Sequence, residues 1–190
     1  MRIISGSAKG KKILIPENKN TRPLKDMVRE SIFNILAHSD LLPSKIENIN
    51  ILDLFSGIGS FGLEAISRGA KKVVFFEEHK PAVNLLIKNI ENLGFKKKCE
   101  ILEKNIYSTQ NLDELNYKFE LVFLDPPFKD ENKNISGIIN NLLSSNILTE
   151  KTLFILHRNK KSRNFDHKKL NILREEFYGS SKIIFFKFNY

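Results

Sequence analysis

The residues of this sequence with the clearest chemistry are Asp125-Pro126-Pro127-Phe128. They follow an apolar run, Phe119–Leu124, that has the pattern of a buried strand. Two prolines cannot donate hydrogen bonds to a β-ladder and they fix their own backbone, so the chain must leave the sheet here in one stiff shape. Such a corner holds a carboxylate, a carbonyl and an aromatic ring in fixed relation. These groups suit a planar base with an exocyclic amino group.

Binding and activation of such an amine as a nucleophile is the chemistry that these residues suit. The amine is a weak nucleophile because its lone pair is delocalised into the ring. Hydrogen bonds to Asp125 and the Pro126 carbonyl would pull the amino group toward tetrahedral geometry, and Asp125 or water would take the proton. The gain would come from positioning and preorganised dipoles. A proline-rich turn capped by Asp125, with Phe128 in the core, is the competing interpretation.

A glycine loop supplies the second chemical signal. Gly57, Gly59 and Gly62 follow an apolar strand and open a helix with the spacing G-x-G-x-x-G, which favours a dinucleotide or a related ligand. Asp53 precedes the loop and would oppose a pyrophosphate, which prefers backbone N–H groups and a helix N-terminus without added negative charge. S-adenosylmethionine carries an ammonium group and no phosphate, so Asp53 favours that ligand. Loop capping by Asp53 and tight packing of the glycines are the alternatives.

Residues after the next two strands extend this candidate ligand site. Glu77 and Glu78 end the second strand of the unit, where a carboxylate can bind ribose hydroxyls. Asn105 follows the third strand and could bind an adenine edge, or it could be an ordinary turn residue. The predicted cofactor-binding set is Asp53, Phe55, Ser56, Gly57, Gly59, Gly62, Glu77, Glu78, Asn105 and Ile106.

Alternating strand and helix patterns must position these residues. The expected strands are Ile49–Phe55, Val73–Phe76, Glu100–Glu103, Leu121–Leu124, Leu153–His157, Ile172–Tyr178 and Ile183–Phe188. The expected helices are Lys25–His38, Ser60–Arg68, Pro81–Leu93 and Ile135–Leu143. Repeated βα units predict a mostly parallel, Rossmann-like α/β sheet with helices on both faces, and the last two strands form a hairpin that adds one antiparallel strand. Ligands in such folds bind at the carboxyl ends of the strands, where the strand order reverses.

Composition restricts the class of protein. The length of 190 residues suits one domain with a small appendage, and 41% hydrophobic residues are enough for a core. Cys99 is the only cysteine, which excludes a disulfide framework and a cysteine-based zinc site and fits a cytoplasmic setting. No apolar run is long enough for a membrane span, and the N-terminus lacks a signal-peptide core.

Positive charge gathers at the two ends of the chain. Residues 1–30 hold 8 Lys/Arg against 3 Asp/Glu, and residues 157–190 hold 9 against 3, whereas the middle is near neutral. Lysine enrichment by genomic drift would spread evenly, so this segregation predicts a polyanionic partner such as nucleic acid. The predicted RNA-contacting residues are Arg2, Lys9, Lys11, Lys12, Arg22, Lys25 and Arg29, with Arg158, Lys160, Lys161 and Arg163 as further candidates. Arg29 could equally form a helix-surface ion pair with Glu30.

Four segments together resemble a known family. MRIISGSAKGKKI, TRPLKDMVRESIFNIL, LDLFSGIGSFGLEAISRGA and LDPPF occur in this order and are similar to the RsmD family, bacterial 16S rRNA (guanine-N2)-methyltransferases. The resemblance spans essentially the whole chain. It implies S-adenosylmethionine as donor, a class I methyltransferase fold, and a guanine N2 acceptor on an assembled or assembling 30S subunit. We also expect a monomer without a bound metal. The resemblance also implies that Asp125 and Pro126 hold the target amine.

The resemblance divides the chain into a basic extension over residues 1–48, a hairpin and helix that contact RNA, and a methyltransferase domain over residues 49–190. His79 and His157 stand where the family pattern leads us to expect acidic residues. His79 would affect contacts near the ribose, and His157 would affect RNA contact past the fifth strand.

Three other function classes stay open at this stage. The Asp-Pro-Pro-aromatic corner also suits an amino-methyltransferase that acts on adenine N6 of DNA or on an amide, although no target-recognition domain is visible. An NAD-dependent oxidoreductase fits the glycine spacing but not Asp53, and the chain leaves no room for a substrate domain. A non-catalytic RNA-binding or assembly protein is the third class.

Overall fold

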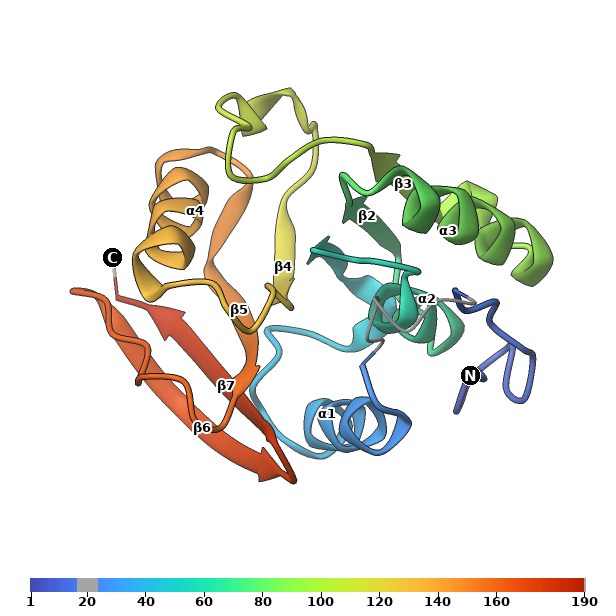
Figure 1. The fold of residues 1–190 in the computed structure, drawn as a ribbon, viewed down its shortest axis with the longest axis horizontal. Coiled ribbons are helices and arrows are strands. Elements are labelled where there is room, and N and C mark those ends of the chain that lie inside the picture. Colours follow the sequence, from blue (N-terminus) through green and yellow to red (C-terminus); the bar gives the residue numbers. More distant parts are fainter. Residues whose placement is uncertain (17–23, 190) are drawn as a thin grey trace.

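The computed structural model describes residues 1–16 and 24–189. Its centre is a seven-stranded sheet with the order β3-β2-β1-β4-β5-β7-β6 (Figure 1). The strands are β1 Asn50–Leu54, β2 Lys72–Phe76, β3 Cys99–Leu102, β4 Phe119–Leu124, β5 Leu148–Asn159, β6 Leu170–Tyr178 and β7 Ser181–Phe188. The first five are parallel neighbours, and β7 runs antiparallel between β5 and β6. The predicted mostly parallel sheet with one antiparallel strand is therefore confirmed.

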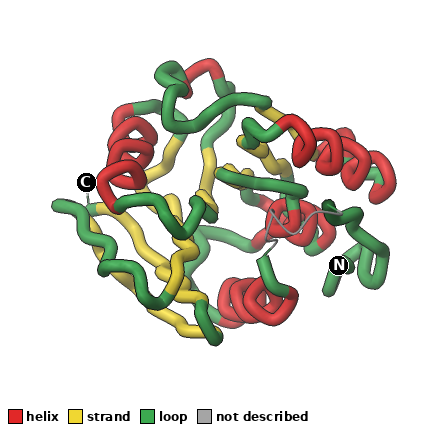
Figure 2. The backbone as a smooth tube through the Cα atoms, in the orientation of Figure 1, coloured by secondary structure: helices red, strands yellow, loops and turns green. Residues whose placement is uncertain are grey.

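Helices cover both faces of this sheet, as Figure 2 shows. They are α1 Asp26–His38, α2 Ser60–Ser67, α3 Lys80–Leu93 and α4 Asn132–Ser144, with short 3-10 turns at Ile46–Asn48, Lys96–Lys98 and Leu112–Glu114. Successive strand residues point to opposite faces, so in β1 Ile51 packs in the cluster with α1, α2 and α3, and Leu52 packs in the cluster with α4. Strands buried on both faces explain why the central strands are continuous apolar runs.

The strand order reverses between β1 and β4. Leu54 at the end of β1 is in register with Leu124 at the end of β4, so the glycine loop and Asp125 start side by side at the same edge of the sheet. A reversal of this kind leaves a crevice at the carboxyl ends of the strands because the two connections leave toward opposite faces. The fold thus brings together the two chemical signals of the sequence.

The N-terminal segment is a hairpin-like turn that is less regular than the predicted hairpin. It forms one antiparallel bridge, between Arg2 and Lys12, rather than two paired strands. Backbone hydrogen bonds from Ile3 to the Lys11 carbonyl and from Ile13 to the Met1 carbonyl, both 3.0 Å, join its two arms. The N–H groups of Ile4 and Ser5 donate to the buried carboxylate of Glu64 in α2. The Glu64 carboxylate thus satisfies backbone donors that the short pairing of the two arms leaves free. The segment also shares one hydrophobic cluster with α1 and the sheet.

Most predicted elements are confirmed with shifts of a few residues at their ends. The largest difference is β5, which starts at Leu148 instead of Leu153 because the polar stretch 149–152 continues the strand without an apolar pattern. Thr152 donates there to the carbonyl of Phe119 at 2.7 Å, which ties this polar stretch to β4. Among the described residues, no helix has the length and apolarity that a membrane span requires.

Candidate active site

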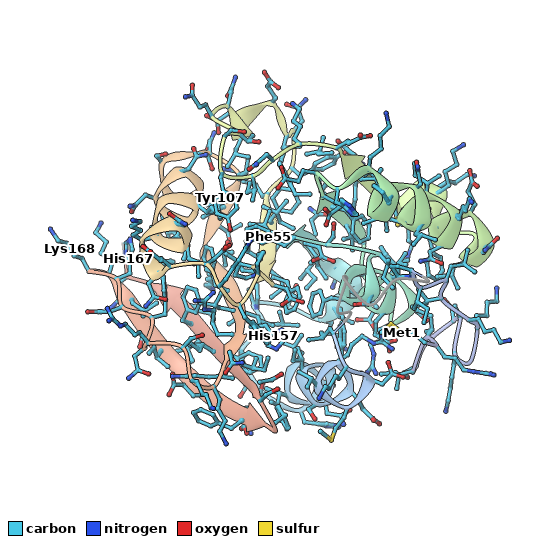
Figure 3. All side chains as sticks on the ribbon, viewed as in Figure 1. Met1, Phe55, Tyr107, His157, His167 and Lys168 are labelled. Carbon is cyan, nitrogen blue, oxygen red and sulfur yellow. The ribbon has the colours of Figure 1, made fainter. Side chains whose placement is uncertain are left out.

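A cavity of about 410 Å³ lies at the carboxyl edge of the sheet. Residues that follow β1, β2, β3 and β4 border it, together with the end of β5 and the start of β7. Its lining consists of Leu24, Lys25, Phe55, Ser56, Gly57, Ile58, Ser60, Phe76, Glu77, Glu78, His79, Lys104, Asn105, Ile106, Asp125, Pro126, Pro127, Phe128, His157 and Ser181. Figure 3 labels two of these side chains, Phe55 and His157.

Backbone geometry shapes the glycine side of the cavity. Gly59 caps α2 in the left-handed region, with φ 81°. A Cβ on Gly62 would lie 2.3 Å from the ring of Phe75, so only glycine lets α2 approach β2 this closely. Phe55 also has a positive φ, 63°, which is costly for a bulky residue, and strained backbone of this kind clusters at functional sites. Its ring packs against Tyr107, with centroids 5.3 Å apart (Figure 3).

Asp53 lies beneath the glycine loop rather than in the cavity lining. Its Oδ2 accepts the N–H of Gly62 at 3.0 Å, and its Oδ1 has no hydrogen-bond partner among the described residues. Burial raises the pKa of this carboxyl well above its usual value; the charges of Asp125 and Glu77 raise it further, against the lowering effect of the Gly62 hydrogen bond. A cation near the loop would favour the ionised carboxylate, because its charge would offset the free-energy cost of burying the negative charge.

The acidic residues after β2 are tied into the loops around them. Glu77 accepts the N–H of Gly57 at 2.7 Å and the N–H of His79 at 2.8 Å, so one carboxylate joins the glycine loop to the β2 turn. Asn105 donates to Glu78 at 2.7 Å and its side-chain oxygen accepts the N–H of Tyr107 at 2.8 Å. Asn105 therefore has the geometry of a turn residue and also lines the cavity.

The Asp-Pro-Pro-Phe corner is fixed from both ends. The N–H of Asp125 donates to the carbonyl of Leu54 at 3.3 Å, next to the start of the glycine loop. Arg158 donates to the carbonyls of Pro127 and Asp130 at 3.4 and 2.5 Å. Because the Arg158 guanidinium is used in this way and is 4% exposed, it supports the corner rather than contacting a phosphate.

Two residues outside the predicted set complete the corner. His157 Nδ1 lies 2.7 Å from Asp125 Oδ1, and His157 Nε2 lies 2.8 Å from Ser181 Oγ. The His157 ring also meets the ring of Phe128 edge to face, with centroids 5.2 Å apart. The carboxylate and the aromatic ring that the sequence assigns to the target amine thus share one neighbour.

This chain matches a known protein family over nearly its whole length. The family profile described as conserved hypothetical protein 95 matches residues 1–187. The chain belongs to this family. A relative from Haemophilus influenzae, ribosomal RNA small subunit methyltransferase D, is 39% identical over 133 residues, which cover 67% of this chain and 64% of the relative. The chain thus aligns with less than two thirds of that relative's length. The resemblance to the RsmD family is confirmed.

Solved structures support the family's fold. The protein yhhF from Escherichia coli superposes with a TM-score of 0.79 at 25% identity, covering 100% of this chain and 98% of that chain. An RNA methyltransferase from Salinibacter ruber, solved in complex with S-adenosyl-L-homocysteine, has a TM-score of 0.64 at 17% identity, covering 88% and 94%. The fold is that of the class I methyltransferases, as the sequence predicts.

The predicted site residues fall into two groups in this structure. Those that line the cavity are Phe55, Ser56, Gly57, Glu77, Glu78, Asn105, Ile106, Asp125, Pro126, Pro127 and Phe128. Asp53, Gly59 and Gly62 lie outside the lining and act through loop and helix geometry. The sequence did not predict some of the lining residues, which lie in the same loops or at the ends of neighbouring strands; examples are Ile58, Ser60, His157 and Ser181. His157 and Ser181 could have been found only from the pairing of β5 with β4 and β7, which no local pattern gives.

The predicted RNA-contacting residues differ in exposure. Arg2, Lys9, Lys11, Lys12 and Lys25 are exposed, as are Lys160, Lys161 and Arg163. Arg22 lies outside the described residues. The prediction that Arg29 contacts RNA is wrong, because its side chain is fully buried. It donates to the carbonyl of Arg2 at 2.6 Å and lies 3.7 Å from Glu64, so it contacts neither a phosphate nor Glu30. An arginine on the inner face of an amphipathic helix must find buried acceptors, and these hold the N-terminal segment in place.

Proposed function

We propose that this protein transfers a methyl group from S-adenosylmethionine to the exocyclic N2 of a guanine in 16S rRNA, presented on an assembled or assembling 30S subunit. The observation that carries the proposal is that the glycine loop and the Asp125–Phe128 corner border one cavity. A donor at the loop and a base at the corner would therefore meet without a domain movement. The name of the Haemophilus influenzae relative supports rRNA as the substrate class.

The residues beneath and beside the loop fit a cationic donor. Asp53 keeps one buried oxygen without a partner among the described residues, and burial raises its pKa, with a further increase from the carboxylates of Asp125 and Glu77. A positively charged ligand lowers the free-energy cost of ionising the Asp53 carboxyl, whereas a pyrophosphate raises this cost. S-adenosylmethionine has an ammonium group and supplies an electrophilic methyl group on a positively charged sulfur. In this proposal Glu77 and Glu78 bind its ribose hydroxyls, and Asn105 and Ile106 contact its adenine.

At the corner, the chain's own residues hold the amine. Asp125 Oδ1 is already bonded to His157, which leaves Oδ2 and the Pro126 carbonyl as the two acceptors for the amino protons. Phe128 stacks on the base, a contact worth about 1–3 kcal/mol in comparable sites. Asp125 accepts the proton once the nitrogen becomes acidic. The guanine must be unpaired or turned out of its helix to reach this depth.

Basic residues on the N-terminal segment supply the phosphate contacts of the proposal. Ser7 donates to the Ser67 carbonyl at the end of α2. With eight residues, α2 is about 12 Å long, which separates this part of the segment from the glycine loop by one helix length. An RNA that contacts both Lys9 and the cavity must therefore span about one helix length between the two contacts.

Transfer of labelled methyl from S-adenosylmethionine tests the function. The acceptors are 30S subunits from a strain that lacks this protein, with naked 16S rRNA and duplex DNA alongside. We expect label on the subunits as N2-methylguanine. Label on DNA alone would move the protein to the adenine amino-methyltransferases. Tight donor binding without label on any acceptor would contradict the proposed activity.

A further inference from the structure

Strand pairing places three polar side chains in a row at the acceptor side of the cavity. Leu124 of β4 is in register with Leu156 of β5, so the next residues, Asp125 and His157, are neighbours. Ser181 of β7 pairs with Asn159, which lies two residues after His157 and so faces the same side of the sheet. The row therefore follows from the topology of the sheet and not from any segment of the sequence.

The row is continuous in hydrogen bonds and becomes more buried toward Ser181. The Asp125–His157 and His157–Ser181 contacts are 2.7 and 2.8 Å long. The side chains of Asp125 and His157 are 22% and 8% exposed, and Ser181 is 5% exposed. In a serine hydrolase the order is reversed, because the serine faces the substrate and the aspartate is buried. Here all three residues line the cavity and the carboxylate is the most exposed of them, so we assign the serine and the histidine to supporting the aspartate.

His157 has the geometry to orient both groups assigned to the amine. Its Nδ1 holds one oxygen of Asp125, and its ring edge packs against Phe128. Ser181 holds the opposite nitrogen, which prevents rotation of the imidazole. A neutral imidazole satisfies both contacts if Nδ1–H donates to Asp125 and Nε2 accepts the hydroxyl proton of Ser181.

We propose that His157, held by Ser181, is a positioning residue for methyl transfer. It fixes Asp125 through Oδ1 so that Oδ2 and the Pro126 carbonyl are presented to the amine, and it fixes the plane of Phe128. This inference rests on the proposed function and refines it, since it assigns His157 to the reaction site rather than to RNA contact. Loss of the orientation should lower the rate of the bound complex without changing donor affinity.

Two substitutions of similar size separate orientation from packing. His157→Asn places an amide N–H near the position of Nδ1 and can still donate to Asp125, whereas His157→Leu keeps bulk and removes the donor. We expect His157→Leu to lower kcat about 100-fold with donor Kd unchanged, on the scale of a misplaced reacting group. His157→Asn should recover most of that loss, and Ser181→Ala should show a smaller decrease in kcat. Thermal unfolding of each variant identifies any that fail to fold.

The carboxyl carbon-13 resonance of Asp125 provides a readout independent of activity. We expect its chemical shift to change in His157→Leu and to return toward the wild-type value in His157→Asn. Equal kcat in the Asn and Leu variants, together with equal Asp125 shifts, would overturn the proposal. If wild-type protein labels no acceptor, the proposed function fails, and the resonance still reports whether His157 orients Asp125.

Discussion

The two sides of the cavity are built by different means. The donor wall, residues 53–62, is one continuous stretch of chain from the end of β1 to the first turn of α2. Its shape comes from glycines and from hydrogen bonds such as the one that the Gly62 N–H donates to the Asp53 carboxylate. The acceptor wall, Asp125–Phe128 with His157 and Ser181, collects side chains separated by 32 and 24 residues along the chain. Substitutions in the donor wall should therefore change folding and ligand affinity, whereas those in the acceptor wall should change the rate of the bound complex.

Removal of the Asp125 carboxylate is the largest expected effect. Asp125→Ala should lower kcat by about 10²–10³-fold, the usual loss when one preorganised polar group of a reaction site is deleted. Donor affinity, measured by isothermal titration calorimetry with S-adenosylhomocysteine, should stay within a few-fold because the donor wall is intact. Asp125→Asn is the matched control that keeps the shape and loses the charge. Near-wild-type turnover of Asp125→Ala would show that the amine is held elsewhere.

Gly62→Ala tests the donor wall, where we expect a change in stability. The added Cβ would lie 2.3 Å from the Phe75 ring, which must shift within a packed core, so we expect a loss of about 1–3 kcal/mol in the free energy of unfolding. Urea denaturation measures it. Gly137→Ala in α4 is the control, because a Cβ there meets nothing within 4 Å and alanine favours a helix. Equal stabilities of the two variants would contradict the close packing of α2 on β2.

The two walls also differ in how much of each could be predicted from the sequence. The glycine loop, the Asp-Pro-Pro-Phe corner and the βα order were predictable because each depends on a short local pattern. The alignment of Asp125 with His157 was not, since it depends on the register of β4 with β5. Arg29 was misassigned to RNA because a charged residue on a helix is normally exposed, and its buried partner Glu64 lies 35 residues away in the printed sequence.

Asp53 allows a smaller, pH-dependent test of the donor wall. Its pKa is raised by burial, so the folded protein binds a proton more tightly than the unfolded chain does. Stability from this group is therefore present at low pH and is lost as pH rises from the unfolded pKa through the folded one, by at most about 1.4 kcal/mol per pH unit. Asp53→Asn removes this dependence. Urea denaturation at several pH values should give unfolding free energies for wild type and variant that diverge as pH rises, and parallel curves would show that Asp53 does not titrate this way.

The smallest expected effect concerns the basic N-terminal segment, which lies outside both walls. Each lysine that contacts a phosphate contributes about 0.7–0.9 to the slope of log affinity against log salt. Lys9→Ala with Lys11→Ala should therefore reduce the slope of 16S rRNA binding by roughly 1.5, while methyl transfer at saturating RNA stays unchanged because the cavity is intact. The control pair is Lys168→Ala with Lys169→Ala, two exposed lysines; Lys168 lies across the molecule from Met1 in Figure 3. If both pairs change the slope equally, the lysines act through net charge alone, and the N-terminal segment is not a specific RNA contact.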